Sequence, residues 1–564
     1  MTLITCYKLK FCNFKRLFHS AKLHLKLYSV IQRLLKLENT FSLSKAAIIV
    51  GFFALLSRLV GLLRDRLFAS AFGAGDTLDV YYAAFRVPDF VFNLLILGTL
   101  SVAFIPVFTE LLYTDEQKAY KNANTILNFS FLVMGAVSLL LMFAAEPLTK
   151  LLVPGFEGEK FQHTVTLTRL FLLSPVIFTL SNVFTSILNA QKKFLIVGLA
   201  PILYNCGIIF GLLLLYPRFG LIGLGYGVII GAILHLVVQI PEAAKNGYRW
   251  RPVIDLKDKS LRKIGKLFIP RIFGLDNSQI SLIIGSIVGS ILASGSIAVY
   301  NLANNLQTVP LGVFAISIAV ASFPVMSEFY AKKDEPSFVK TLGTSIVKIL
   351  FFMVPISILI LIFRAYIVRL AFGAGNFGWQ DTILTFNTLG IFSFSLFAQS
   401  LSPLLARAFY ARHNTITPVT INLLVMAVNA GLAYYLGKTF GITGVAAAFS
   451  VASVLSAGLL FFILRVNLGK AFSDQKSAYL INFDNLISHS LLKIAASSII
   501  MGSVGYGLLY GVEKFVNTHT GLGLLIQAGL AASIAVIVYL MAASYLKLSQ
   551  ADVILAKLKS YVSK

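Results

Sequence analysis

The chain has 564 residues, of which 57% are hydrophobic and only 13% charged, and its mean hydropathy is +0.83. Soluble proteins typically carry about 25% charged residues, so this composition excludes a soluble fold and predicts a polytopic membrane protein. The net charge of +25 would suggest nucleic acid in a soluble protein, but here Lys and Arg collect in particular loops, so no nucleic-acid partner is expected.

Residues 1–44 read as a basic extension. The first 45 residues hold nine Lys or Arg against the single acid Glu38, and charge interrupts the apolar residues throughout. This pattern excludes a secretory signal. The stretch LFHSAKLHLKLYSVIQRLLKL is typical of an amphipathic helix on an anionic membrane surface, and a disordered basic leader fits the same composition.

Fourteen apolar segments are long enough to cross the hydrocarbon core as helices, which takes about 20 residues each. We therefore predict an all-α polytopic membrane protein with about 14 transmembrane helices. The predicted spans are 46–71, 78–112, 123–151, 162–189, 194–216, 219–243, 262–293, 296–330, 338–371, 381–411, 415–437, 440–465, 487–511 and 521–547.

The loops predict the orientation. Alternate connections are rich in Lys and Arg, the largest being 244–266, whereas the intervening FGAGDTLD, SGS and GKTFG hold one lysine among them. Because basic loops stay in the cytoplasm, both termini are predicted to be cytoplasmic.

Three sequence pairs recur at nearly one spacing, 218 or 221 residues. They are VAFIPVFTELLY with VASFPVMSEFYA, NAQKK with YARHN, and RFGLIG with TFGITG. The repeat predicts two pseudo-symmetric six-helix lobes around a central cavity, plus two C-terminal helices. The predicted parts are the extension 1–44, an N-lobe 45–245, a basic cytoplasmic linker 246–261, a C-lobe 262–466, a cytoplasmic loop 467–486, two helices in 487–548 and a cytoplasmic tail 549–564.

The first span carries charge in the stretch SRLVGLLRDRLFASAFGAGD at 57–76. Arg58 lies a dozen residues into the span, too deep for easy snorkelling to the surface. A cation at the bilayer centre costs about 3 kcal/mol unless it faces a protein interior or a wet cavity. Arg58 and Asp65 share one helix face, and Arg64 is displaced around the helix.

Polar residues continue in the later spans, and two interpretations stay open. Arg58 with Asp65, and Arg271 with Asp276, could be buried ion pairs that fix helix packing. Alternatively, the guanidinium groups line a cationic cavity for an anionic substrate, since they suit phosphate oxygens. The candidate substrate-binding residues are Arg58, Arg64, Asp65, Asp79, Arg86, Arg271, Asn304 and Asn305.

Catalytic signatures are missing from the sequence, which has no GxSxG, HExxH, P-loop or DxD motif. Cys6, Cys12 and Cys206 have no spacing typical of a disulfide framework or a zinc site. These features favour a transporter without an organic or metal cofactor over an enzyme.

The stretch SRLVGLLRDRLFASAFGAGDTLDVYYAAFRVPDF resembles the opening of the MurJ (MviN) family of lipid II flippases, in the superfamily of MATE exporters and polysaccharide flippases. FIPVF, SQISLII, LASGS and the Thr417–Pro418 pair extend the resemblance over residues 45 to about 550. It implies an alternating-access carrier in the bacterial cytoplasmic (inner) membrane. Its cargo would be an undecaprenyl-pyrophosphate-linked disaccharide-pentapeptide, moved from the cytoplasmic to the outer leaflet for peptidoglycan synthesis.

The resemblance also implies site residues. The family's cavity residues match Arg58, Arg64, Asp79 and Arg86. Where the family has paired arginines and a glutamate, this chain has Phe92, Asn93 and Leu97, and an Asp-Arg pair becomes Asn304-Asn305. Either the site is rebuilt, with Arg271 moving into the cavity, or the substrate differs.

The driving force and partners are further expectations. The membrane potential supplies about 2.3 kcal/mol per charge per 100 mV, and family members also use sodium, for which Asp276 with Asn422 or Asn429 is a candidate site. The expected partners are the anionic lipid-linked substrate, membrane lipids, and proteins of peptidoglycan synthesis and division, with the chain itself a monomer.

Four other functions compete with a lipid II flippase. A flippase for another lipid-linked oligosaccharide would explain why this chain lacks the arginines that the resemblance implies. A MATE-like exporter of small cations needs acidic residues within its lobes. A scaffold that transports nothing would tolerate neutral residues in place of the buried arginines, and a membrane glycosyltransferase, the least supported, needs catalytic carboxylates at an interface.

Overall fold

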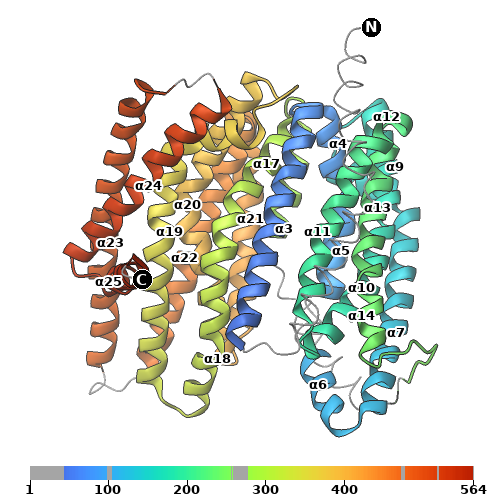
Figure 1. Cartoon of the computed structure of the whole chain (residues 1–564), viewed down its shortest axis with the longest axis horizontal. Helices are drawn as coiled ribbons and strands as arrows, with labels where there is room; N and C mark the ends of the chain where they lie inside the picture. The colour runs from blue at the N-terminus through green and yellow to red at the C-terminus, as the bar shows by residue number, and fades with distance from the viewer. Residues whose placement is uncertain are drawn as a thin grey trace.

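The structure is a computed structural model, and it describes residues 43–97, 104–255, 257, 277–471, 477–516 and 520–562. Within these ranges every regular element is a helix and there is no strand (Figure 1). The predicted basic extension 1–44 lies almost wholly outside the described residues.

The helices of the first half follow one another in a nearly continuous series. In chain order they are α3 (Leu43–Phe72), α4 (Asp76–Ala84), α5 (Arg86–Phe92), the π-helical η1 (Asn93–Leu97), α6 (Ile105–Thr114), α7 (Glu116–Phe143), α8 (Ala145–Leu152), α9 (Gly158–Phe171), α10 (Leu173–Ala190), α11 (Phe194–Phe210), the π-helical η3 (Gly211–Leu215), α12 (Tyr216–Phe219), α13 (Leu221–Val237) and α14 (Ile240–Lys245).

The second half has longer helices. They are α16 (Asn277–Ser290), α17 (Ser296–Pro310), the π-helical η4 (Leu311–Ile316), α18 (Ser317–Ala331), α19 (Glu335–Phe372), α20 (Trp379–Ala411), α21 (Ile416–Phe440), α22 (Ile442–Ala471), α23 (Ser477–Glu513), α24 (Gly521–Tyr545) and α25 (Ser549–Val562).

The all-α polytopic class is confirmed. Eleven helical segments of the described residues are long and apolar enough to cross a membrane, and they match eleven predicted spans in order. Of the other three, 46–71 is the 30-residue α3, 78–112 is divided among α4, α5, η1 and α6, and 262–293 lies partly outside the described residues. The count of fourteen therefore stays a prediction.

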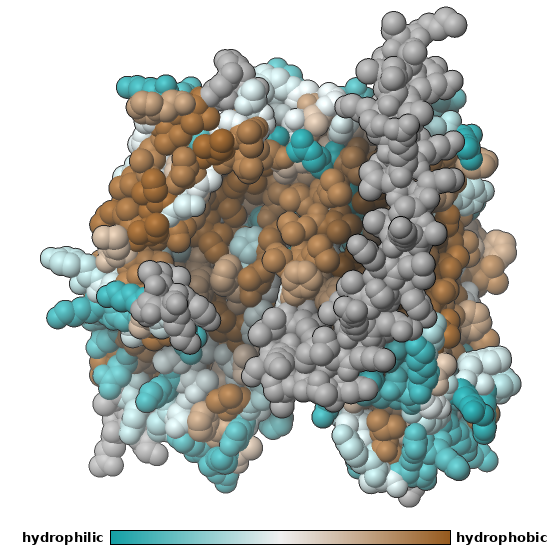
Figure 2. All heavy atoms as spheres, viewed as in Figure 1, coloured by the Kyte–Doolittle hydropathy of each residue, from teal (hydrophilic) through white to brown (hydrophobic). Residues whose placement is uncertain are grey.

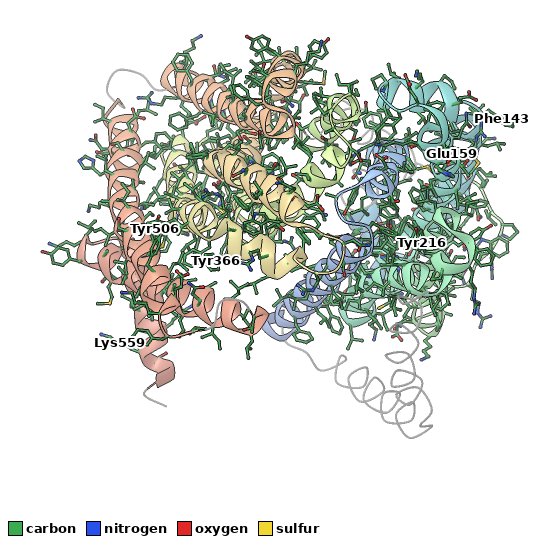
Figure 3. All side chains as sticks on the ribbon, turned by 90° about the horizontal axis from the view of Figure 1, so that it is seen from above. Phe143, Glu159, Tyr216, Tyr366, Tyr506 and Lys559 are labelled. Carbon is green, nitrogen blue, oxygen red and sulfur yellow. The ribbon has the colours of Figure 1, made fainter. Side chains whose placement is uncertain are left out.

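The helices gather into two lobes with α3 between them (Figures 1 and 3). From here on, the N-lobe means α4 to α14, which is the predicted N-lobe 45–245 without α3, and the C-lobe means α16 to α22. Each lobe has its own buried apolar core, and α23 and α24 pack against α19 on the outside of the C-lobe. Seen from above, Tyr216 and Tyr366 lie on opposite sides of α3.

Two connections differ from the predicted boundaries. Helix α22 extends to Ala471 and α23 begins at Ser477, so helix fills much of the segment 467–486 that we expected to be a loop. The predicted tail 549–564 forms helix α25.

The internal repeat is visible in the backbone of matching turns. Gly220 and Gly441, from RFGLIG and TFGITG, have left-handed φ angles of 58° and 64°, and each carbonyl accepts a 3.0 Å hydrogen bond from the N–H three residues later. Lys192 and His413, the fourth residues of NAQKK and YARHN, have φ angles of 61° and 58°. The same turns at the same places support a duplicated unit.

The lobes interlock at the end of the molecule where α3 finishes. Ala69 of α3 is buried in the C-lobe core, and Ile297 and Ala298 of α17 are buried in an N-lobe cluster. We call this the closed end. At the opposite, open end, the tips that hold α6 and α18 part toward the lower edge of Figure 2.

The close backbone contact between α13 and η3 in the N-lobe can be tested by substitution. A Cβ at Gly227 of α13 would lie 2.6 Å from Gly211 Cα, whereas nothing lies within 4 Å of one at Gly135 of α7. Gly227→Ala should therefore lower stability, since overpacking typically costs about 1–3 kcal/mol. Thermal unfolding of the purified protein measures this against Gly135→Ala, and equal melting temperatures for the two variants would contradict the contact.

Candidate functional site

Arg58 lies near the middle of α3 with an exposed guanidinium. Its Nη1 donates to the Val309 carbonyl oxygen of α17 at 2.8 Å. A Cβ at Gly312 would lie 1.9 Å from Arg58 Nη2, so the guanidinium rests directly on the π-helical η4. One donor is thus used to attach α3 to the C-lobe. A guanidinium carries five N–H donors, so the others are available to an anion at the exposed face.

A second polar cluster ties α3 to both lobes. Arg64 forms an ion pair with Asp65, with Nη2 2.7 Å from Oδ1, and its Nη1 donates to Asn205 of α11 at 3.0 Å. Asn305 of α17 donates to the other carboxylate oxygen of Asp65 at 3.0 Å. The ion pair in the structure therefore joins Arg64 to Asp65, and Arg58 takes a backbone carbonyl instead.

Arg86 of α5 is buried and reaches across to the C-lobe. Its Nε donates to Ser286 Oγ at 2.7 Å, and its Nη2 donates to Asn301 Oδ1. Both acceptors are neutral, and within the described residues no ion pair neutralises this charge. Asp89 is exposed and close enough to Arg86 and Arg64 for their charges to interact.

Asp79 of α4 caps a helix in the other lobe. Its side chain is 1% exposed, and its two oxygens accept from the backbone N–H groups of Gly295 at 2.8 Å and Ala298 at 2.9 Å. These are donors at the start of α17, whose own N-cap residue, Gly295, has no side chain to offer. The carboxylate also pairs with Lys160 at 3.1 Å. An anion suits this position because a helix N-terminus carries partial positive charge.

Two identical FGAG loops, 72–75 and 372–375, meet at the closed end. The Asn376 N–H donates to Ser70 O at 2.9 Å, and its side-chain amide donates to Ala71 O at 2.7 Å. In return, the Ala74 N–H donates to Asp381 at 3.1 Å. The second loop was not among the predicted site residues, although the repeated tetrapeptide is present in the sequence.

The residue at position 295, beside these loops, is a glycine because the backbone of Ala74 passes too close for a side chain. A Cβ at Gly295 would lie 1.9 Å from the Ala74 carbonyl oxygen, and Gly295 has a φ of +84°. Ser294 next to it donates to Asp76 at 2.6 Å, and Arg66 of α3 donates to the Leu370 carbonyl. The closed end is therefore sealed by backbone contact as well as by charge.

We call the contacts of α3 with the two lobes, made by Arg58, Arg64 and Asp65, the seam. Other predicted residues lie away from it. Asn304 accepts from Gln307 at 3.0 Å, and Gln307 accepts from Gln399 at 3.1 Å, which forms a polar chain inside the C-lobe. At two positions where the resemblance implied arginines, the Phe92 ring lies 5.6 Å from that of Phe178, and Asn93 donates to the Asp89 carbonyl at 2.7 Å.

The candidate sodium site is only partly described, because Asp276 lies outside the described residues, as does the candidate substrate-binding residue Arg271. Asn429 donates to Ser281 at 3.2 Å, and its buried Oδ1 has no hydrogen-bond partner among the described residues. Asn422 is half-buried two turns away on α21. Over the ranges that the structure covers, no three His, Cys, Asp or Glu side chains gather as a metal site would need.

The chain matches the family model described as "Lipid II flippase MurJ" over residues 68–556. A probable lipid II flippase MurJ of Thermotoga maritima is 30% identical over 452 residues, which cover 79% of this chain and 87% of that protein. The lipid II flippase MurJ of Burkholderia cenocepacia is 27% identical over 436 residues, 75% of this chain and 84% of that protein.

Two solved structures share the fold. A lipid II flippase MurJ in an inward closed conformation has a TM-score of 0.69 and 25% identity, over 88% of this chain and 98% of that one. A MATE multidrug transporter of the MOP superfamily, in an inward-facing conformation, has a TM-score of 0.62 and 15% identity, over 75% of this chain and 98% of that one.

The cap by Asp79 makes a second test. Asp79→Ala leaves two backbone donors without partners at about 1–3 kcal/mol each, enough to shift the closed-to-open ratio by roughly two orders of magnitude. Spin labels at exposed Glu157 and Gln380, which flank the closed end on opposite lobes, should report a longer distance. Glu159→Ala is the control, and an unchanged distance in Asp79→Ala would rule out the cap as a latch.

Acid should loosen the same contact. Burial raises the pKa of Asp76, but hydrogen bonds from Lys160 and Ser294 outweigh it, so the pKa lies below its ordinary value near 4. Because its pKa is lowered in the closed state, the ionised Asp76 carboxylate stabilises that state fully above about pH 4. This stabilisation is lost as the pH falls further. The label distance should therefore lengthen below pH 4, and less so in Asp76→Asn. Identical pH profiles for the two proteins would exclude Asp76 as a contributor.

Proposed function

The chain belongs to the lipid II flippase MurJ family, and we propose that it is an alternating-access flippase that moves lipid II from the cytoplasmic to the outer leaflet. It is a transporter rather than an enzyme. The observation that carries the proposal is the seam itself, where charged groups of α3 lie between two lobes that interlock at one end and part at the other.

We propose that the open end faces the cytoplasm. Lys192, Lys193, Lys332 and Lys333 lie in turns at this end, and Figure 2 shows hydrophilic side chains on the tips of both lobes below a hydrophobic belt. The FGAG loops at the closed end carry no lysine or arginine. Basic loops favour the cytoplasm, so both termini are cytoplasmic and this conformation would take up substrate from the inner leaflet.

Arg58 is the group best placed to hold the pyrophosphate. It is exposed, one of its five N–H donors is used on the Val309 carbonyl, and it lies near the middle of α3. Arg64 is already paired with Asp65. Its proposed role is therefore to orient the polar cluster and to add positive electrostatic potential for the anion. The lipid tail would stay in the bilayer while the head group crosses between the lobes.

The membrane potential is our proposed driving force. It favours outward movement of a doubly charged head group by about 4–5 kcal/mol at 100 mV, so no nucleotide is required. Sodium is a second candidate, held by Asp276 with Asn422 or Asn429. The Oδ1 of Asn429 supports this site, since it has no partner among the described residues, and an ion would satisfy a buried amide oxygen that is otherwise costly.

The proposed working unit is a monomer, because both lobes of the seam belong to one chain. Proteins of peptidoglycan synthesis and division remain proposed partners. The lost arginines at Phe92, Asn93 and Asn305 keep a second cargo open, another lipid-linked oligosaccharide with less charge near the bilayer centre.

Arg58→Ala and Arg64→Ala should each abolish growth rescue in a flippase-depleted bacterium, because the anion loses its donor or Asp65 loses its partner. Arg58→Lys should rescue partly, since the charge stays but the planar fork is lost. Immunoblots of membranes check insertion, and exposed Arg218→Ala is the control. Full rescue by Arg58→Ala would favour a scaffold that does not transport.

Proteoliposomes test cargo directly. Lipid II and other polyprenyl-pyrophosphate sugars are loaded in separate vesicles, and head-group accessibility is followed with and without an imposed potential. Movement of lipid II that speeds up with the outward-favouring potential is expected. Movement of only another lipid-linked sugar would reassign the cargo, and no movement of either would refute the flippase.

A further inference from the structure

The N-lobe has a cavity of about 510 Å³ at its open end, away from the seam. It lies between the start of α7, the α10–α11 turn and the end of α14. The side chains that matter here are Tyr113, Tyr120, Gln191, Lys192, Lys193 and Asn246.

Hydrogen bonds hold the walls of this cavity together. The Tyr120 hydroxyl donates to the Asn246 carbonyl at 2.5 Å, and the Gln191 amide donates to both at 3.1 Å. These bonds join three segments separated by more than fifty residues each. The cavity is therefore a built feature of the N-lobe and not a gap between loose loops.

The chain that follows Asn246 is strapped to α7. Tyr248 donates to Asn124 at 2.7 Å, Asn128 donates to the carbonyls of Arg251 and Val253, and the Trp250 indole donates to Asn128 at 3.0 Å. An ion pair of 2.7 Å between Lys121 and Asp255 ends the strap. Residues 248–255 thus have a fixed course along the helix.

This strap presents Arg249, Trp250 and Arg251 outward, and all three are exposed. Trp250 is 61% exposed and Tyr113, at the cavity, is 77% exposed. Tryptophan and tyrosine favour the membrane–water interface, and Lys and Arg on the cytoplasmic side attract anionic lipids. Rigid aromatic and basic groups at one rim are typical of a site for a lipid head group.

The charged side chains in the cavity limit which class of ligand it can bind. Lys192 and Lys193 supply two cations that suit a phosphodiester, and the carboxylate of Glu116 also faces the cavity. A carboxylate accepts hydrogen bonds from hydroxyl groups, so it suits a head group that combines a phosphate with free hydroxyls. Phosphatidylglycerol has this combination, whereas a choline head group offers no donor.

We propose that this cavity binds the head group of an anionic, hydroxyl-bearing glycerophospholipid of the cytoplasmic leaflet. Its phosphate lies between Lys192 and Lys193, and its acyl chains run along α7 past Trp250. Tyr120 and Asn128 are eight residues apart on α7, about 12 Å along the axis, which is within the length of an acyl chain. The assignment of the leaflet rests on the orientation proposed above.

The chain offers its own reporter, because it has two tryptophans, Trp250 and Trp379. In Trp379→Phe only Trp250 fluoresces. The protein is placed in nanodiscs of phosphatidylcholine with a minority of phosphatidylglycerol. Two samples are compared. In one the phosphatidylglycerol carries bromine on its acyl chains, and in the other an equal amount of phosphatidylcholine carries it. Brominated phosphatidylglycerol should quench Trp250 more strongly, since each basic residue near an anionic lipid enriches it about fivefold.

Lys192→Gln with Lys193→Gln should lower this excess quenching severalfold, to the part that Arg249 and Arg251 beside Trp250 maintain, and Lys192→Arg with Lys193→Arg should retain it. The matched control is Lys332→Gln with Lys333→Gln, the lysine pair of the α18–α19 turn, where Lys333 has a φ of 59° like the 61° of Lys192. Equal quenching by both brominated lipids, or an excess that loss of Lys192 and Lys193 leaves undiminished, would overturn the site.

This measurement is independent of transport. It uses no lipid II and both leaflets carry the same lipids, so a failed flippase assay or a reversed orientation leaves its outcome readable. Melting temperatures of the double variants, taken in the same nanodiscs, show whether the N-lobe stays folded.

Discussion

The carboxylate of Asp79 at the start of α17 is the contact on which the closed end depends. It belongs to the N-lobe, yet it satisfies backbone donors of the C-lobe that have no other cap. A buried carboxylate is stable only where it is paired and hydrogen-bonded, and Lys160 completes the set. We therefore expect the lobes to separate here in one step, because separation exposes the Asp79 carboxylate, the Lys160 ammonium group and the start of α17 together.

The polar residues of α3 apply the same constraint deeper in the molecule. Asp65 is held by Arg64 on its own helix and by Asn305 from the C-lobe, and Arg64 in turn reaches Asn205 of the N-lobe. Charged groups in a low-dielectric interior need partners in every conformation. Alternating access then becomes an exchange of partners, in which water or an anionic head group replaces contacts that the opposite lobe provides in this state.

The positions at which the resemblance implied arginines show what connects the lobes in this chain. Asn305 donates to Asp65 at 3.0 Å. Phe92 and Asn93 contribute an aromatic contact and a local hydrogen bond, neither of which brings charge. Hydrogen bonds thus connect the lobes here, and the exposed guanidinium of Arg58 lies on the same helix as Asp65.

Hydropathy, loop charge and the repeated motifs determined the class, the order of the spans and the family, because each is a local property of the chain. RFGLIG and TFGITG indicated a duplicated unit, and Gly220 and Gly441 have matching positive φ angles in their turns. Only the tertiary structure decided which groups pair: Asp65 with Arg64 and Asn305, Asp79 with the start of α17, one FGAG loop with the other. These partners lie more than 200 residues apart in all but one case, and a hydrogen bond depends on ångström-scale docking of two lobes that no local pattern encodes.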